Sequence, residues 1–148
     1  EHGSLRQLSL YPTSISSAGM IRLLREETLD IRIVNLTLDT YLEYRKAGIP
    51  TLRVLRADGK VGEKVSSFYI SNFKLTDEAF ADMVAGIEHL MTNRPMEVYV
   101  NNNQLTDASI PTILKFRGLQ FLYLSDNQFT DEGIQQLQQA LPGCRIEQ

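Results

Sequence analysis

The residues of this chain that could perform acid–base chemistry form two closely spaced pairs, Asp30 with Arg32 and Glu97 with Tyr99. Side chains two residues apart on a strand share one face, so a proton could in principle pass within either pair. A general acid or base also needs a pocket that shifts its pKa, which an open sheet face does not provide. We therefore expect solvated surface groups at both places and no catalytic residue.

The sequence also offers few residues for binding a metal or for nucleophilic catalysis. The two histidines, His2 and His89, have no partner at metal-ligand spacing, and the only cysteine is Cys144. One thiol makes neither an internal disulfide nor a metal site, and we expect Cys144 to be a packing residue. No glycine-rich phosphate loop and no nucleophile elbow occurs, so no metal and no cofactor is predicted. A chain with a single cysteine fits a reducing compartment such as the cytoplasm slightly better than an oxidising one, but the sequence leaves the compartment undetermined.

Composition excludes two classes of partner. The chain is 43% hydrophobic and 22% charged with a net charge of −3, which is typical of a globular protein. It has no run of Lys or Arg, so nucleic acid is not expected as a partner. No apolar stretch approaches the ~20 residues of a membrane-spanning helix, so membrane insertion is not expected either.

The elements that would position any site are repeats. Residues 95–113 and 119–137 align when Asn103 is placed on Asn127, a spacing of 24 (127 − 103). The shared positions include Thr106-Asp107 on Thr130-Asp131 and apolar residues on apolar residues. A repeat this short cannot bury its own apolar face, so neighbouring copies must bury one another's.

Further copies lie upstream. Residues 65–83 match with an offset of 30 (105 − 75), followed by a longer helix, and residues 5–23 form a first copy. The middle, 28–64, is irregular: strands are predicted at 29–33 and 52–55, with a short helix from Thr40 to Ala47 that ends at Gly48. Asp58-Gly59 indicates either a loop or a local hairpin.

Each repeat has a simple physical logic. Alternation puts Leu122 inside and Tyr123 outside a strand. The asparagine after the strand can bond free backbone groups, and Thr-Asp then begins and caps a helix. A helix between parallel strands gives a right-handed crossover. Pro111 falls within the first turn of its helix, where a missing N–H costs little.

Residues 119–137 fit the pattern LxxLxLxxNxxTDxGxxxL, which resembles leucine-rich repeats of the ribonuclease-inhibitor-like class and, more closely, their short bacterial versions. The resemblance implies an α/β fold: a right-handed solenoid with a curved parallel sheet of about six strands on the concave face and helices on the convex face. It also implies protein recognition, with no shared catalytic residues. We expect one domain over 1–148, a fragment of a longer bacterial protein, with 1–4 a possible tag remnant.

A second resemblance competes in the middle of the chain. Residues 31–61 are similar to the centre of a thioredoxin-like fold, with Ile49-Pro50-Thr51 before a predicted strand, although the Cys-x-x-Cys motif is missing. This alternative predicts a cis peptide bond before Pro50. It also keeps open an enzyme with its site near Pro50.

Outward positions on the strands give a candidate binding face. Tyr69, Tyr99 and Tyr123 are equivalent in three repeats and would form a ladder on strands ~4.8 Å apart. Such a row could bind a partner or could simply be self-stacking tyrosine on an exposed strand. The candidate binding residues are Tyr11, Arg32, Tyr69, Glu97, Tyr99, Asn101, Phe121 and Tyr123. The polar run from Asn101 to Gln104 is interpreted as turn chemistry.

The sequence thus favours a non-enzymatic module that binds a protein or peptide through its concave face. The alternatives are a structural spacer within a larger protein and an enzyme in the irregular middle. That middle also carries Arg53, Arg56, Lys60 and Lys64, either as a positively charged binding loop or as part of a decayed repeat.

Overall fold

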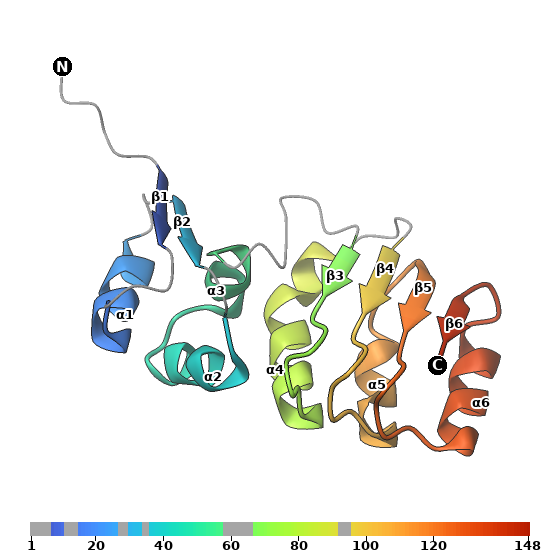
Figure 1. The fold of residues 1–148 in the computed structure, drawn as a ribbon. Coiled ribbons are helices and arrows are strands. Elements are labelled where there is room, and N and C mark those ends of the chain that lie inside the picture. The colour runs from blue at the N-terminus through green and yellow to red at the C-terminus, as the bar shows by residue number, and fades with distance from the viewer. Residues whose placement is uncertain (1–6, 11–14, 27–29, 34–35, 58–66, 92–95) are drawn as a thin grey trace. The chain divides into compact units, whose positions relative to one another are not determined.

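The fold is given by a computed structural model that describes residues 7–10, 15–26, 30–33, 36–57, 67–91 and 96–148 (Figure 1). The chain divides into two compact units, Glu1–Gly62 and Glu63–Gln148, and each is described by itself. The expectation of a single domain over 1–148 stays a prediction.

The second unit is built around a parallel sheet of four strands whose spatial order is their order in the chain. A helix stands between each strand and the next, so the unit alternates strand and helix throughout. The strands are β3 (Ser67–Tyr69), β4 (Met96–Tyr99), β5 (Leu119–Tyr123) and β6 (Arg145–Glu147). The helices are α4 (Asp77–Ile87), α5 (Ile110–Ile113) and α6 (Asp131–Ala140), with short 3₁₀ turns η1 (Glu88–Leu90) and η2 (Asp107–Ser109).

All three of these helices lie on one side of the sheet (Figure 1). The inward row of Phe68, Val98 and Leu122 runs straight across β3, β4 and β5, and each of these side chains is fully buried. Phe68 meets Phe116 with ring centroids 5.6 Å apart. The predicted alternation of apolar and outward residues is therefore confirmed for this unit.

The described residues of the first unit form a parallel pair, β1 (Gln7–Leu10) and β2 (Asp30–Ile33), and three helices. The helices are α1 (Ser17–Arg25), α2 (Leu38–Lys46) and α3 (Thr51–Ala57). Gly48 follows α2 with φ of +84°, a backbone conformation that glycine adopts without a Cβ penalty. The predicted short helix and its stop at Gly48 are both confirmed.

Polar contacts tie this unit together from within. The Arg53 guanidinium donates to the carbonyl oxygens of Leu24 and Glu26 at 3.1 and 2.6 Å, where the last turn of α1 leaves carbonyls unpaired. The hydroxyls of Tyr41 and Thr51 lie 3.1 Å apart in the core. Arg53 is thus a structural anchor here. Lys60 and Lys64, and the turn at Asp58-Gly59, lie outside the described residues.

The predicted strand at 52–55 is wrong, because these residues belong to α3. The amides of Arg53 and Val54 both donate to the carbonyl of Pro50 as the helix begins. Thr51, Val54 and Leu55 are buried at positions i, i+3 and i+4, the period of a helix face. A short apolar run does not separate a buried strand from a buried helix, which is why the alternation misled.

Two further expectations, the sheet of about six strands and the cis peptide bond before Pro50, can be compared with the structure. The strands among the described residues pair as a set of four and a set of two, so a single sheet of about six strands is not observed. Every peptide bond in the described parts of the chain is trans, including the one before Pro50. The thioredoxin-like alternative thereby loses the cis bond that it predicts.

Candidate binding face

The register of the second unit's strands arranges the outward residues in rows. One row consists of Ser67, Glu97, Phe121 and Arg145, and the next of Tyr69, Tyr99, Tyr123 and Glu147. We call the side of this sheet that carries both rows the open face, because α4, α5 and α6 lie on the opposite side (Figure 1).

Three tyrosines on the open face stack on one another as the predicted ladder requires. The ring centroids of Tyr69 and Tyr99 are 4.3 Å apart, and those of Tyr99 and Tyr123 are 4.5 Å apart, with interplanar angles of 15° and 18°. These spacings match neighbouring strands, so each ring stands upright on its own strand. We call these three residues the tyrosine stack.

Stacking decides which part of each ring a ligand can reach. Tyr99 has a stacked neighbour on both sides, so both faces of its ring are covered and only the ring edge is left for a ligand. Tyr69 stands at the β3 end and is 46% exposed, the most exposed of the large hydrophobic side chains in the described residues. One face of its ring stacks on Tyr99, and no other aromatic ring of the described residues covers the second face.

The Glu97–Tyr99 pair is a hydrogen bond on the open face. The Tyr99 hydroxyl donates to Glu97 Oε2 at 2.9 Å. This bond, and secondly partial burial, raise the pKa of Tyr99 well above its usual range. A raised pKa keeps the phenol protonated, whereas a tyrosine acting as a base would need a lowered one. The hydrogen bond fixes the Tyr99 hydroxyl and the Glu97 carboxylate relative to each other on the open face.

A second polar group lies at the β6 end. The Arg145 guanidinium sits over the Phe121 ring, with Cζ 5.2 Å from the centroid, and Nη2 is 2.7 Å from Glu147 Oε1. Phe121 also contacts Tyr123, with centroids 4.3 Å apart. We call Phe121, Arg145 and Glu147 the Arg145 cluster. It combines a cation–π contact with an ion pair on one strand edge.

Asparagines after the strands fix the spacing of the repeats. Asn103 Oδ1 accepts from the amides of Phe73 and Leu75 at 3.0 and 2.9 Å, and Nδ2 donates to the carbonyls of Ile70 and Val100. Asn127 repeats this one unit later, accepting from Leu105. The turn interpretation of this polar run is confirmed, with the addition that each amide also bonds the preceding repeat.

The Thr-Asp pairs act on two repeats at once. Each threonine caps its own helix: Thr76 accepts from the Ala79 amide and Thr130 from the Gly133 amide. The aspartate, in contrast, reaches the next repeat. Asp107 accepts from the amide and hydroxyl of Thr130 at 2.9 and 2.5 Å. Sequence spacing predicts the cap, but does not reveal that the carboxylate bridges repeats.

Asp77 makes the same bridge one repeat earlier. Its carboxylate accepts from the Thr106 amide and hydroxyl and from the Ser109 hydroxyl. Burial acts to raise the pKa of Asp77, but these hydrogen bonds outweigh it and the pKa is lowered overall. The two bridges thus link the repeats of β3, β4 and β5, the three strands that carry the tyrosine stack.

Six of the eight sequence-predicted binding residues come together on the open face. They are Tyr69, Glu97, Tyr99, Asn101, Phe121 and Tyr123. Asn101 lies two residues after Tyr99, and its side-chain oxygen accepts a hydrogen bond from the Ser71 hydroxyl at 2.6 Å. Arg32 belongs to β2 in the other unit, and Tyr11 lies outside the described residues. Whether any of the eight binds a partner stays a prediction.

Arg145 and Glu147 were missed as members of this face. The available clue was Ile146, which pairs with the inward Leu122 and so turns both of its neighbours outward. A final strand of three residues offers too little alternation to assign its faces from sequence alone. The missed residues supply a full charge pair at one end of the stack.

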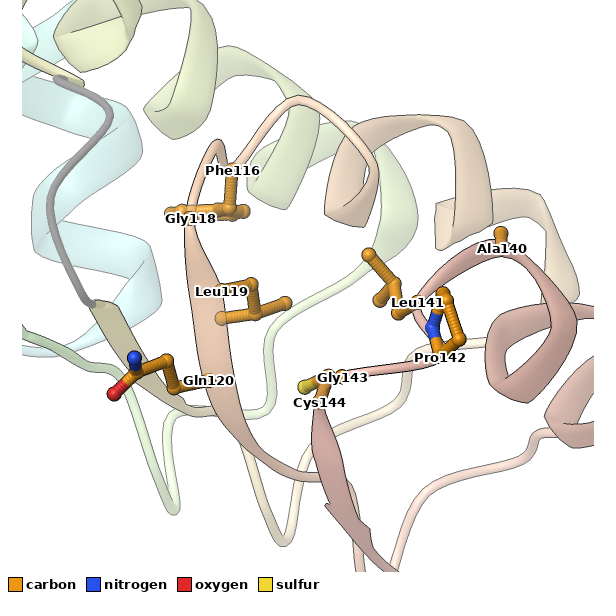
Figure 2. Close-up of a pocket in the computed structure, with 9 residues that line it drawn as sticks. All are labelled: Phe116, Gly118, Leu119, Gln120, Ala140, Leu141, Pro142, Gly143 and Cys144. Atoms are coloured by element: carbon orange, nitrogen blue, oxygen red, sulfur yellow. The ribbon is translucent and has the colours of Figure 1, made fainter.

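Three chemical candidates from the sequence remain, Cys144, Pro50 and His89. Cys144 lines an open hollow of about 400 Å³ with Phe116, Leu119 and Leu141, at the start of β5 and the loop before β6 (Figure 2). Burial raises the pKa of its thiol, which is the behaviour of a packing residue. Pro50 and His89 are exposed. Within the described ranges, no three His, Cys, Asp or Glu side chains gather as metal ligands.

Comparison with known proteins adds no identity. The sequence matches no profile of a protein family, and no curated protein matches it. Among the helices that the structure describes, none is long and apolar enough to cross a membrane.

Proposed function

We propose that this chain is a non-enzymatic interaction module of the leucine-rich-repeat type, which binds an extended peptide segment of a partner protein through the open face. In this proposal the strand–helix units form a right-handed solenoid with a curved parallel sheet, and the open face is its concave side. The partner lies across the tyrosine stack.

The repeat class is supported by bonds that recur at the repeat step. The asparagines at 103 and 127 each bond two successive repeats, and the aspartates at 77 and 107 each bond the threonine of the next. Bonds of this kind need parallel units stacked in one direction, as in solenoid proteins.

The observation that carries the binding proposal is the tyrosine stack on a sheet face without helices. Tyrosine side chains offer apolar ring edges and hydrogen-bonding hydroxyls together, the combination that is enriched at protein interfaces. The neighbouring Phe121 extends the aromatic surface towards β6, with Tyr99 and Phe121 centroids 6.3 Å apart. Fixed stacking also means that little side-chain entropy is lost on binding.

A structural spacer is the second candidate, and one observation favours it. The central ring of the stack has both faces covered by its own neighbours, as a purely stabilising ladder would have. This candidate predicts that the whole chain binds no peptide through the open face. The two candidates therefore differ in a single measurable property.

The test is selection of random phage-displayed peptides on the whole chain, followed by affinity measurement on variants. Replacing Tyr69, Tyr99 and Tyr123 together by alanine should abolish binding of the selected peptides. The matched control is Leu114→Ala, which removes another large exposed side chain, 40% accessible, beside α5. Circular dichroism and thermal unfolding establish that each variant is folded.

Two outcomes decide the proposal. Peptides that lose binding in the tyrosine variant and keep it in the Leu114 variant support an interaction face. If no peptide is selected, or if binding survives loss of all three tyrosines, the open face is not the site and the spacer is favoured.

A further inference from the structure

Strand β6 is the end strand of the second unit's sheet, and among the described strands it pairs only with β5 (Figure 1). We call its other side the free edge. The Glu147 carbonyl accepts from the Leu124 amide at 2.8 Å, so the backbone groups of Glu147 face β5. Successive residues of a strand direct these groups to opposite sides. The N–H and C=O of Ile146 therefore point to the free edge, where a further strand could bond them.

The inward side chain of β6 is less covered than its counterparts on the other strands. Ile146 pairs with Leu122 and so continues the inward row of Phe68, Val98 and Leu122. Those three side chains are fully buried, whereas Ile146 is only partly buried. A strand added at the free edge would bring a neighbour to Ile146 and remove more of its apolar surface from water.

The charges of β6 are symmetric about Ile146. Arg145 precedes it and Glu147 follows it, and both side chains lie on the open face. If two copies of β6 run antiparallel with Ile146 opposite Ile146, each Arg145 lies opposite a Glu147. The two Ile146 residues then form a pair that exchanges both backbone hydrogen bonds, with the groups that point to the free edge. The charged residues occupy the adjacent pairs, where opposite side chains approach most closely.

Other arrangements of the same strand are less favourable. A parallel pair of β6 strands in the same register would place Arg145 beside Arg145 and Glu147 beside Glu147, and like charges at opposed positions repel. The antiparallel pair is instead complementary to itself, which is the property of an interface built about a two-fold axis. Charge complementarity thus favours a second copy of this chain as the occupant of the free edge.

The helix next to β6 is compatible with this pairing. A two-fold axis perpendicular to the sheet leaves the helices of both copies on one side, with the two α6 helices antiparallel. The exposed positions in the body of α6 are neutral, namely Gln135, Gln136, Gln138 and Gln139. The acidic first turn, with Asp131 and Glu132, lies at opposite ends of the two helices. The arrangement therefore opposes no cluster of like charges across the axis.

We infer that β6 is a dimer interface, at which two copies of this chain pair antiparallel about a two-fold axis at Ile146. The two four-stranded sheets become one continuous sheet, and their open faces become one surface. Each Arg145 then lies between its own Glu147 and the Glu147 of the second copy. This inference goes beyond the proposed function and does not depend on peptide binding at the tyrosine stack.

The experiment is analytical ultracentrifugation of the whole chain over a range of concentrations, with two charge reversals. Arg145→Glu and Glu147→Arg each place like charges opposite one another, so each variant alone should dimerise at least about tenfold more weakly than the wild type. An equimolar mixture of the two variants should form a heterodimer, because each strand then meets the opposite charges. Both variants lose the ion pair within one copy, so recovery in the mixture reports only contacts between copies.

Two controls accompany this experiment. Lys74→Glu reverses a charge at an exposed position after β3, at the other end of the sheet, and should dimerise like the wild type. Circular dichroism and thermal unfolding establish that every variant is folded. Hydrogen exchange followed by nuclear magnetic resonance reports on the backbone: the Ile146 amide should exchange more slowly as the wild-type concentration rises.

The inference is supported by a wild-type dimer that each reversal weakens and the mixture restores, with protection of the Ile146 amide. A chain that stays monomeric up to about 1 mM overturns it, as does a dimer that neither reversal weakens or a mixture that does not recover. A dimer with an unprotected Ile146 amide also overturns it. Arg145 and Glu147 would then serve to keep the edge strand unpaired. The tyrosine stack is unchanged in all of these variants, so peptide binding tests the proposed function separately.

Discussion

Replacing Gly133 by alanine should destabilise the chain, although the same change in an ordinary helix stabilises it. A Cβ at this position would lie 2.2 Å from Asp107 Oδ1 and 2.6 Å from Asp107 Cγ, so the carboxylate must move. That carboxylate is the bridge to Thr130, with bonds of 2.9 and 2.5 Å. Moving it away breaks the connection between two repeats.

The sizes of two opposing effects decide whether Gly133→Ala stabilises or destabilises the chain. Glycine to alanine inside a helix usually gains up to ~1 kcal/mol. Two hydrogen bonds to a charged group are worth ~1.5–3 kcal/mol each when sheltered. We take about half of that for each bond at this exposed site, so the total loss is about 1.5–3 kcal/mol. The net expectation for Gly133→Ala is a loss of about 0.5–2 kcal/mol in the free energy of unfolding.

The assay is urea unfolding followed by circular dichroism, in a double-mutant cycle with Asp107→Ala. Once the carboxylate is removed, Gly133→Ala has nothing to displace, and it should then stabilise by up to ~1 kcal/mol. The sign of the alanine effect therefore reverses between the two backgrounds. Stabilisation by Gly133→Ala in the wild-type chain would refute the carboxylate bridge.

Three further predictions concern the same repeats. Asn103→Ala should lower the free energy of unfolding by about 3 kcal/mol or more, because it orphans buried amides and carbonyls, and Asn127→Ala, at a less buried position, should cost less in the same urea titration. Asp77→Asn should lower the free energy of unfolding at neutral pH. Because the folded-state pKa of Asp77 is lowered, the stability difference between the two chains should persist above the unfolded pKa of ~3.9 and shrink as the pH falls through the folded-state pKa. Acid-unfolding curves of both chains measure this difference. In an ultraviolet titration Tyr99 should ionise at a higher pH than a free tyrosine, and Glu97→Gln should lower the pKa of Tyr99. Because the folded-state pKa of Tyr99 is raised, its contribution to stability is fully present below the unfolded pKa of ~10 and is lost as the pH rises through the folded-state pKa. Ionisation of Tyr99 at the same pH in both chains would contradict the Glu97 bond.

The second unit could be predicted from sequence because its copies repeat their polar residues as well as their apolar ones. Asn103 and Asn127 at one position, and Thr-Asp at another, fix the alignment and hence the faces of each strand. Alternation then places Tyr69, Tyr99 and Tyr123 in one row, and the observed register confirms it. Periodicity carries this information because one strand register serves every copy.

The bridges between repeats could not be predicted in the same way. A sequence gives the spacing of Asp107 from its own helix, which is enough to expect a favourable charge at the helix start. It does not give the distance to Thr130, which depends on how the next unit stacks. Gly133 illustrates the difference: the pattern marks the glycine, but its reason, the neighbouring carboxylate, belongs to another repeat.

The irregular middle resisted prediction because local signals there compete. Thr51 to Leu55 offers both an alternating pattern and a helical one, and the helix prevails through burial of Thr51, Val54 and Leu55 together. Arg53 looked like surface charge, yet its partners are carbonyls at 24 and 26, far away in sequence. Long-range polar contacts of this kind leave no periodic trace.

The most direct test of binding through the open face is nuclear magnetic resonance of the whole chain bound to a selected peptide. We expect intermolecular contacts between peptide protons and the ring protons of Tyr69, Tyr99 and Tyr123. Contacts confined to the side of the sheet covered by α4, α5 and α6 would contradict it, and would assign the tyrosine stack to stability alone.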